Sequence, residues 1–370
     1  MLLGIDTSTY LEQQRLAHSV YKKDGKPVDP FKIFQDNGVT VLRTRIWNNP
    51  YSEDGEPYLA GTCDVDNFIK LAEYVRPYGF KHMVDFHYSD HWADPSKQYL
   101  PKAWRNYSFE EVVNAVYEFT KESLLKIKSH DIDVGMVQIG NEITHGMLWP
   151  FGQLNWEEDI NACFDRFASL LKSGIKAAKE VYPNIKAIIH LEQSYDQNAY
   201  RLILSNLIKR GVQIDILGTS YYPFWHHGFD EYFANMDMVQ REFNIPVMNV
   251  ELGFPFTLID YKLDIETGKQ HLVINTDNIE DYLKMMPFYP DEDGQAKFIE
   301  TFLKLAKEHH LCGVCYWEPL WIPGEGICWA SKAGQEYQHS NAKDTRNEWA
   351  NQCLFDYQGN ALPALDKFKV

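Results

Sequence analysis

The sequence predicts an α/β fold, a (β/α)8 TIM barrel that forms a single domain over residues 1–370. Eight short apolar, β-branched runs can be counted, and segments with helical periodicity lie between them. Strands that alternate with helices pair in parallel, and eight repeats favour a closed barrel over an open sheet. A length of 370 residues is normal for such a barrel with long loops, which we expect after strands seven and eight.

The predicted elements follow one another without a sequence repeat, a low-complexity tract or an interdomain linker, which favours one domain. Ser108, with Glu111 three residues later, is a candidate N-cap for the first long helix. Helical periodicity is clearest over Phe109–Ile127, Phe164–Ala178 and Ala296–His309. The eight predicted strands are Leu2–Ile5, Val39–Ile46, Phe80–Phe86, Val134–Ile139, Ile185–Leu191, Ile214–Tyr221, Ile245–Val250 and Cys312–Tyr316.

Charge and composition exclude several classes of partner. The net charge of −16 argues against nucleic acid and anionic membrane surfaces, and it mildly favours a neutral substrate; the alternative is that the acidity only keeps the protein soluble. No run of about 18 apolar residues predicts a membrane span. No signal peptide is evident, so we expect either a cytoplasmic protein or a mature form that begins with Met. Cys328 and Cys353 lie in loop-like segments and could pair.

Two glutamates each follow a short apolar run that predicts a buried strand. Glu142 ends the segment Val137–Glu142, and Glu251 ends the segment Pro246–Glu251. A carboxylate at such a place is costly to desolvate unless it has a partner or a chemical role. The carboxyl ends of barrel strands meet at one rim, where the catalytic residues of barrel enzymes lie. The pair therefore predicts the arrangement that cleavage of a glycosidic bond needs.

The positions of the two glutamates favour a retaining double displacement. They follow the fourth and seventh predicted strands, nearly opposite each other, and can approach to about 5–5.5 Å, as retention requires; inversion needs about 6.5–9.5 Å. We assign Glu142 as the acid/base, its pKa raised by ionised Glu251, and Glu251 as the nucleophile. Asn141 is expected to donate to a sugar 2-hydroxyl, and Arg45 to keep Glu251 ionised. The alternative is that one glutamate only forms a buried ion pair with Arg45.

Further polar residues follow the predicted strands. His87 could hold a sugar hydroxyl, orient a carboxylate or be a hydrogen-bonded core histidine. His190 and Glu192 could either line the rim or support it. A catalytic metal bound by the acidic residues and histidines of Asp85–His91 is disfavoured, because no His-x-His pair ends the first strand.

Five tryptophans follow strand ends, and an indole face can stack on the C–H face of a sugar ring. The axial 4-hydroxyl of galactose leaves one such face. A single tryptophan is more often part of a core, but five near one rim favour a sugar-binding surface; they are Trp92, Trp149, Trp225, Trp317 and Trp321. The candidate substrate-binding residues are together Arg45, Asp85, His87, Ser89, Asp90, Trp92, Asn141, Trp149, His190, Tyr221, Trp317 and Trp321.

On these residues the chain resembles the endo-β-1,4-galactanases of glycoside hydrolase family 53, from about residue 4 to the C-terminus. The blocks Asp85–Pro95 and Gln138–Pro150 are specific, whereas Asn-Glu alone is shared by many barrel glycosidases. One departure is Leu252–Pro255 after the second glutamate, where relatives usually carry Thr and a small residue. The matching segments are Gly38–Asn48, Asp85–Pro95, Lys102–Trp104, Met136–Glu142, Gly146–Pro150, Ser220–Trp225 and Tyr316–Trp321.

The resemblance implies an enzyme that cuts β-1,4-linked galactan, or type I arabinogalactan side chains of pectin, with retention. It places the acid/base on Glu142 and the nucleophile on Glu251, and it implies a secreted or cell-surface protein. We expect a monomer that needs no cofactor. The alternatives are a retaining barrel glycosidase for another β-linked polysaccharide, such as mannan, and a non-catalytic glycan-binding barrel. Some bacterial relatives bind structural calcium in the long loop 256–290; the weak calcium candidates here are Asp260, Asp264 and Asp277 in that loop and Asp344 outside it.

Overall fold

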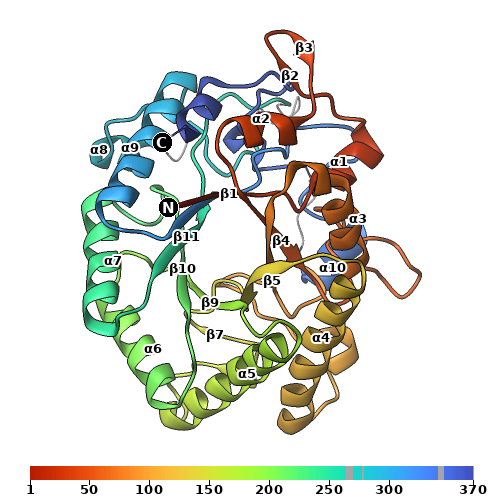
Figure 1. Cartoon of the computed structure of the whole chain (residues 1–370), viewed down its shortest axis with the longest axis vertical. Helices are drawn as coiled ribbons and strands as arrows, with labels where there is room; N and C mark the ends of the chain where they lie inside the picture. Colours follow the sequence, from red (N-terminus) through yellow and green to blue (C-terminus); the bar gives the residue numbers. More distant parts are fainter. Residues whose placement is uncertain (263–269, 277–278, 341–345, 370) are drawn as a thin grey trace.

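Eight parallel strands close into a barrel in the order β1-β12-β11-β10-β9-β6-β5-β4, which confirms the predicted fold class. The computed structural model describes residues 1–262, 270–276, 279–340 and 346–369. Figure 1 shows the ring of strands with helices around it. Each predicted strand is present within two residues at either end. The barrel strands are β1 Leu2–Asp6, β4 Val41–Ile46, β5 Lys81–Phe86, β6 Val134–Ile139, β9 Lys186–Leu191, β10 Ile216–Tyr221, β11 Val247–Leu252 and β12 Gly313–Tyr316.

Helices connect and cover the strands. The Ser108 hydroxyl accepts from the Glu111 backbone N–H (3.3 Å) and the Glu111 carboxylate accepts from the Ser108 N–H (2.7 Å), which is the capping box predicted for α4. No helix among the described residues is long and apolar enough to cross a membrane. The helices are α1 Tyr10–Ala17, α2 Pro30–Asp36, α3 Val65–Val75, α4 Phe109–Ser129, α5 Ile160–Val181, α6 Gln197–Lys209, α7 Phe229–Phe243, α8 Glu280–Met285, α9 Glu292–Glu308 and α10 Lys332–Tyr337.

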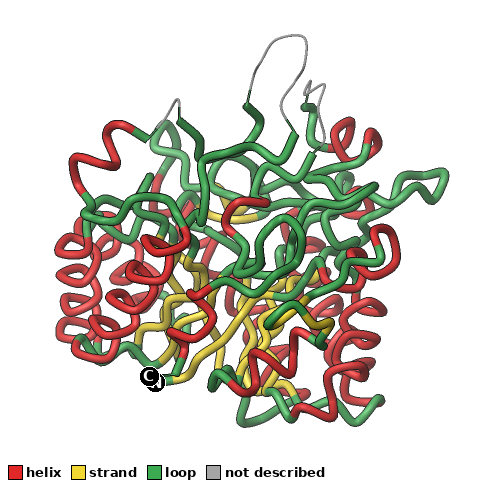
Figure 2. Tube along the Cα trace, turned by 90° about the horizontal axis from the view of Figure 1, so that it is seen from above, coloured by secondary structure: helices red, strands yellow, loops and turns green. Residues whose placement is uncertain are grey.

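Short additions complete the described secondary structure. Two hairpins with strands of two residues pair outside the barrel, and four 3₁₀ segments occur in connections. Figure 2 shows both termini at one end of the barrel and the loops gathered at the other. The hairpin strands are β2 Lys22–Lys23 with β3 Lys26–Pro27, and β7 Gly146–Met147 with β8 Gly152–Gln153; the 3₁₀ segments are Arg76–Tyr78, Lys102–Trp104, Ala350–Gln352 and Pro363–Phe368.

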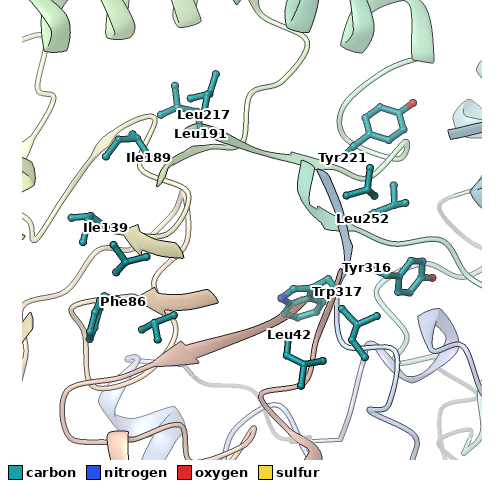
Figure 3. Packing of buried hydrophobic residues seen from close by; sticks show 14 of the residues in the cluster. Leu42, Phe86, Ile139, Ile189, Leu191, Leu217, Tyr221, Leu252, Tyr316 and Trp317 are labelled. Atoms are coloured by element: carbon teal, nitrogen blue, oxygen red, sulfur yellow. The ribbon is translucent and has the colours of Figure 1, made fainter. Parts of the chain in front are cut away.

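Near their amino ends the strands carry apolar residues on both faces. The outward residues pack against the helices, and the inward residues fill the interior of the barrel. Figure 3 shows Tyr221 and Tyr316 on the outer side of the ring and Trp317 on its inner side. Towards the amino ends of the strands the interior is an apolar cluster, made of Val41, Met83, Met136, Ile188, Ile216, Met248, Val250 and Cys315.

Two residues further along four neighbouring strands, the inward positions become polar. Arg43 on β4, Asp85 on β5, Gln138 on β6 and His190 on β9 are all buried. Gln138 bonds to Arg43 and to Asp85, and its side-chain nitrogen lies 3.2 Å from a ring nitrogen of His190. The buried interior therefore ends in a hydrogen-bonded layer, and the functional groups lie on that layer.

A β-bulge in β11 gives one residue an inward direction that simple alternation would not. Thr219 on β10 lies opposite Asn249, but the next residue, Ser220, lies opposite Glu251. Val250 is thus the extra residue, and the alternation of side chains changes phase there. As a result Val250 contributes to the apolar interior and Glu251, its direct neighbour, also points into the barrel.

Candidate active site

A cavity of about 300 Å³ lies at the carboxyl ends of the strands, and we call it the barrel-mouth cavity. It contains both glutamates identified from the sequence and a wall of aromatic side chains. Its lining residues are His87, Trp92, Ala93, Asp94, Pro95, Asn141, Glu142, Glu192, Tyr222, Trp225, His226, Glu251, Trp317, Trp329 and Trp349.

Glu142 enters the cavity from the turn that follows β6. Gly140 and Glu142 both have positive φ angles, 83° and 50°, and this turn aims the Glu142 side chain across the barrel. The Ser220 hydroxyl donates to Glu142 Oε1 (2.8 Å). Burial raises the pKa of Glu142 well above its usual range, and the carboxyls of Glu251 and Glu192 raise it further. Glu142 is therefore a carboxyl group that keeps its proton.

Glu251 has stronger hydrogen-bond donors. Arg43 Nη2 lies 2.9 Å from its Oε1, and the Tyr222 hydroxyl donates to its Oε2 (2.9 Å). Burial raises the pKa of Glu251 to about 7, while Arg43 and Tyr222 act in the opposite direction. Among the described residues, the Ser220 hydroxyl is the one hydrogen-bond donor to the Glu142 carboxyl. Of the two carboxyls, Glu251 is therefore the one that ionises first.

The cation beside Glu251 is Arg43, and the expectation that Arg45 fills this place is wrong. Both arginines point into the barrel from β4, but Arg43 lies two residues deeper, where Asp6, Asp85 and Glu251 converge on it. Its guanidinium lies 2.9 Å from Asp6, 2.8 Å from Asp85 and 2.9 Å from Glu251. The alternative that a glutamate pairs with Arg45 as a structural bridge therefore does not describe Glu251.

Arg45 instead pairs with the carboxylate of Glu318. Its Nη1 lies 2.6 Å from Glu318 Oε1, and its Nη2 donates to the Ala60 carbonyl (2.8 Å). The guanidinium carbon lies 4.3 Å from the ring centre of Trp92, a cation–π contact. Arg45 does not line the barrel-mouth cavity, so it supports the aromatic wall from behind.

Asp85 and His87 form a buried unit beneath the cavity. Asp85 accepts from Gln138 Nε2 (2.6 Å) and pairs with Arg43, and it is fully buried. His87 Nδ1 accepts from Trp47 Nε1 (3.2 Å) and from the Ala93 backbone N–H (3.3 Å). The ring proton is therefore on Nε2, which donates to Asp85 Oδ2 (3.0 Å). His87 orients a carboxylate, one of the roles expected for it, and its ring also lines the cavity.

Asn141 lines the cavity, and its amide is held at both ends. Its Oδ1 accepts from Arg43 Nη2 (3.0 Å), and its Nδ2 donates to the Ala93 carbonyl (2.9 Å). An amide nitrogen carries two hydrogens, so one remains for a ligand. The contact with a sugar 2-hydroxyl stays a prediction.

The aromatic wall contains three of the five predicted tryptophans, Trp92, Trp225 and Trp317, together with Trp329 and Trp349. Trp329 stacks on Trp92 with ring centres 4.5 Å apart, and Trp349 meets Trp317 edge-on at 4.8 Å. Trp225 is 48% exposed and so extends the wall towards solvent.

Two of the predicted tryptophans do not line the cavity. Trp321 is buried, with its ring 5.5 Å from that of Trp329 and 6.2 Å from that of Trp92, so it supports the wall from behind. Trp149 is half-buried, and its ring nitrogen donates to the His145 carbonyl (3.2 Å).

Ser89 and Asp90, two further predicted substrate-binding residues, lie outside the cavity. Ser89 donates to the His91 carbonyl within a turn. Asp90 is buried and accepts from the backbone N–H groups of Asn49 (3.0 Å) and Lys102 (2.7 Å). Each of these two side chains is therefore used to hold a loop.

Tyr221 and His190 are also excluded from direct contact with a ligand. Tyr221 faces outward into the helix layer, where its ring stacks with that of Phe302 (5.3 Å); its neighbour Tyr222 faces the cavity. His190 is fully buried and contacts Ser220. Tyr221 points outward because side chains alternate along a strand, whereas His190 points inward but lies too deep in the barrel to reach the cavity.

Sequence reasoning missed Arg43, Tyr222, Trp329 and Trp349, and left Glu192 between two interpretations. Glu192 lines the cavity, and its Oε2 accepts from the Thr144 N–H (3.3 Å), while its buried Oε1 has no hydrogen bond within the described part of the chain. The alternation of β10, with Ser220 inward, would have selected Tyr222. The two tryptophans lie in irregular segments after β12, where no periodicity marks their direction.

The remaining expectations concern metal and cysteine. Asp260 is buried and accepts from the backbone N–H groups of Lys262 (3.0 Å) and His271 (2.7 Å). Asp264, Asp277 and Asp344 lie outside the described residues, so the calcium site stays a prediction. Cys328 and Cys353 are not bonded to each other.

The chain is similar to known proteins over its whole length. The sequence model of glycosyl hydrolase family 53 matches residues 2–368. An endo-beta-1,4-galactanase of Bacillus subtilis (strain 168) is 32% identical over 385 aligned positions, covering 99% of this chain and 85% of that protein. The structure of an Ignisphaera aggregans family 53 catalytic domain is 35% identical, with a TM-score of 0.86 and coverage of 99% and 95%. A fungal beta-1,4-galactanase structure is 25% identical, with a TM-score of 0.77 and coverage of 100% and 98%.

Proposed function

Because the chain belongs to glycosyl hydrolase family 53, we propose that it is an endo-β-1,4-galactanase that cleaves galactan by a retaining double displacement. Glu251 is the nucleophile and Glu142 is the acid/base. The observation that carries this assignment is that two carboxyls in one cavity have unequal hydrogen-bond donors. In the described part of the chain, Glu251 accepts from Arg43 and Tyr222, whereas Glu142 accepts from Ser220 alone.

In the first step Glu251 attacks the anomeric carbon of the bound galactosyl unit. The bond to the leaving sugar breaks, and Glu142 gives its proton to the departing glycosidic oxygen. A galactosyl ester of Glu251 and a shortened chain with a new hydroxyl result. Glu251 enters this step ionised because a guanidinium and a phenol stabilise its charge, and Glu142 enters it protonated because burial and two neighbouring carboxyls oppose its ionisation.

In the second step Glu142, now a carboxylate, removes a proton from water. The water oxygen attacks the anomeric carbon and displaces Glu251, so the configuration at that carbon is inverted a second time and is retained overall. Ionising Glu251 again raises the pKa of Glu142, which prepares it to hold the proton it has just taken. Glu142 is therefore protonated while Glu251 is ionised, and it can lose its proton while Glu251 is an uncharged ester.

Substrate selection is assigned to the aromatic wall. The rings of Trp92, Trp317, Trp329 and Trp349 give the cavity apolar faces for the C–H face of galactose, and Trp225 continues them towards solvent. A row of aromatic faces that extends out of the cavity suits an internal stretch of polymer, which supports endo action. Because such a polymer cannot cross a membrane, we also propose that the protein acts outside the cell, as a monomer.

Incubation with linear galactan tests the proposal. We expect a series of galacto-oligosaccharides by mass spectrometry and a new β-anomer as the first product in proton NMR. Glu251→Gln should abolish activity, and Glu142→Ala should lose far less on an aryl galactoside whose leaving group needs no acid. Retained turnover on galactan in both variants, or an α-anomer as the first product, would contradict it. A panel with mannan and other β-linked polymers separates galactanase activity from the alternative substrate classes.

A further inference from the structure

His190, one of the predicted substrate-binding residues, contacts the backbone of Glu142 directly and its carboxyl through Ser220. The Glu142 backbone N–H donates to His190 Nδ1 (3.4 Å), and the Ile143 N–H donates to the His190 carbonyl (3.0 Å). His190 Nε2 lies 2.8 Å from Ser220 Oγ, which is itself 2.8 Å from Glu142 Oε1. The histidine is fully buried and does not line the barrel-mouth cavity, so it acts on the glutamate and not on a ligand.

The direction of these hydrogen bonds follows from counting protons. Ser220 has one hydroxyl proton, and it donates that proton to Glu142 Oε1. The contact between Ser220 Oγ and His190 Nε2 is then a hydrogen bond only if the histidine donates. In that tautomer Nδ1 has a lone pair, which suits the backbone N–H of Glu142 (3.4 Å) and the side-chain nitrogen of Gln138 (3.2 Å). The contact of Nδ1 with Asn141 Oδ1 (3.1 Å) is then not a hydrogen bond, because both atoms are acceptors.

Glu142 needs such support because of its backbone conformation. Its φ of 50° lies in the left-handed region, which is unfavourable for a residue with a side chain and persists only where the surroundings impose it. The hydrogen bonds from Glu142 and Ile143 to His190 hold this turn against β9. A shift of the turn would move the carboxyl away from the glycosidic oxygen, and a misplacement of about 1 Å can cost about a hundredfold in rate.

We propose that His190 is a positioning residue for the acid/base, holding the backbone of Glu142 directly and its carboxyl through Ser220. The inference rests on the proposed function and adds to it the residue that positions the proton-donating carboxyl of Glu142. Ser220 occupies Oε1, and Oε2 has no hydrogen bond to any described residue, so Oε2 is the oxygen that carries the proton into the cavity. The proton leaves from Oε2 to the glycosidic oxygen and returns to Oε2 from water.

The test compares galactan with dinitrophenyl β-galactobioside, whose leaving group needs no proton. We expect Ser220→Ala and His190→Ala to lower kcat/KM on galactan about a hundredfold and to leave kcat/KM on the aryl substrate within about threefold of wild type. Their kcat on the aryl substrate should rise with added azide, which attacks the glycosyl-enzyme without a base. His190→Gln, which keeps a donor towards Ser220, should recover at least about tenfold of the galactan activity lost in His190→Ala.

Thr219→Val is the matched control. It removes a buried hydroxyl from the adjacent position of β10, where Thr219 Oγ1 contacts the Tyr232 hydroxyl (2.8 Å) on the outer face of the barrel. We expect full activity on both substrates. Equal losses on galactan and on the aryl substrate in the Ser220 and His190 variants, or no loss in either, would overturn the proposal. A wild-type protein that does not cleave galactan would instead refute the proposed function, and Ser220→Ala decides the matter if His190→Ala does not fold.

Discussion

Replacing Tyr222 by phenylalanine removes one oxygen atom from the candidate active site and keeps the ring. The lost hydroxyl donates to Glu251 Oε2 at 2.9 Å. The aromatic packing of the side chain is preserved, including its edge-on contact with Trp349 at 5.2 Å. The substitution therefore isolates one hydrogen bond to the proposed nucleophile.

The size of the effect follows from the charge of the acceptor. A hydrogen bond to an ionised group contributes about 1.5–3 kcal/mol, and most of that is absent when the carboxyl is protonated. One pKa unit corresponds to about 1.36 kcal/mol, so Tyr222→Phe should raise the pKa of Glu251 by about 1–2 units. Since Glu251 reacts as the carboxylate, activity below that pKa should fall about 10–100-fold.

The assay is the pH dependence of kcat/KM on dinitrophenyl β-galactobioside. This substrate does not need the proton of Glu142, so the acid limb of the profile reports the ionisation of Glu251 in the free enzyme. We expect the acid limb of Tyr222→Phe to move to higher pH by about 1–2 units, with part of the rate recovered above it. Tyr221→Phe is the control, because that hydroxyl donates to the His227 carbonyl (2.9 Å) from a ring packed outside the barrel.

An unshifted acid limb in a folded Tyr222→Phe protein would refute this reasoning. It would mean that the titrating group is not Glu251, or that the hydroxyl does not stabilise its charge. A shift of equal size in Tyr221→Phe would mean that losing either tyrosine hydroxyl at the end of β10 has the same effect, whether or not it contacts Glu251. Thermal unfolding of both variants separates these outcomes from simple destabilisation.

Three further changes have predictable results. Glu192→Gln should lower the pKa of Glu142 by removing a neighbouring carboxyl, so the alkaline limb of kcat/KM on galactan should move to lower pH by up to about one unit. Glu142→Gln should raise the unfolding temperature at pH 7 but hardly at pH 5, because the pKa of Glu142 is raised on folding and the free-energy cost of burying its carboxyl therefore grows as the pH rises above its unfolded pKa. Ser108→Ala should reduce the free energy of unfolding by about 1 kcal/mol in urea titration, because it opens the capping box of α4, and should leave activity unchanged.

The strands could be predicted from the sequence because a barrel buries both of their faces. The runs Ile185–Leu191 and Ile214–Tyr221 each contain neighbouring apolar residues, such as Ile188–Ile189 and Ile216–Leu217, and they stand out between amphipathic helices. Helix ends are less well marked: the segment Phe164–Ala178 is part of the longer α5, which begins at Ile160 and ends at Val181. The hairpin β7–β8 was not predicted, because strands of two residues carry no periodicity.

Alternation along a strand predicts direction but not depth, and this explains the error over Arg43. On β4 Arg43 and Arg45 both point inward, and both are 1% exposed. The neighbours at each level decide which one meets Glu251, and those neighbours come from β1, β5 and β11. A single sequence does not give the relative levels of strands that are more than a hundred residues apart.

Glu251 illustrates a second limit, because its inward direction depends on the bulge at Val250. Regular alternation from Met248 would place Val250 inward and Glu251 outward, into the helix layer. The expectation that Glu251 faces the mouth came from its place at the end of an apolar run and from the resemblance to a family, not from alternation. The bulge supplies the physical reason, and removing it would move the carboxylate from one side of the barrel wall to the other.

The separation of roles between the two glutamates depends on how one cation is shared. Arg43 contacts Asp6, Asp85 and Glu251 at 2.8–2.9 Å, so its charge is divided among three carboxylates and does not make Glu251 a strong acid. Burial still raises the pKa of Glu251, and Tyr222 adds the second donor that favours its ionised form. Glu142 forms no ion pair with a cation of the described segments and is close to the carboxyls of Glu251 and Glu192, so its pKa is raised further. The difference between acid and nucleophile is therefore a difference in hydrogen-bond donors between two groups in the same cavity. For that reason the loss of a single hydroxyl, from Tyr222 or from Ser220, should change the reaction.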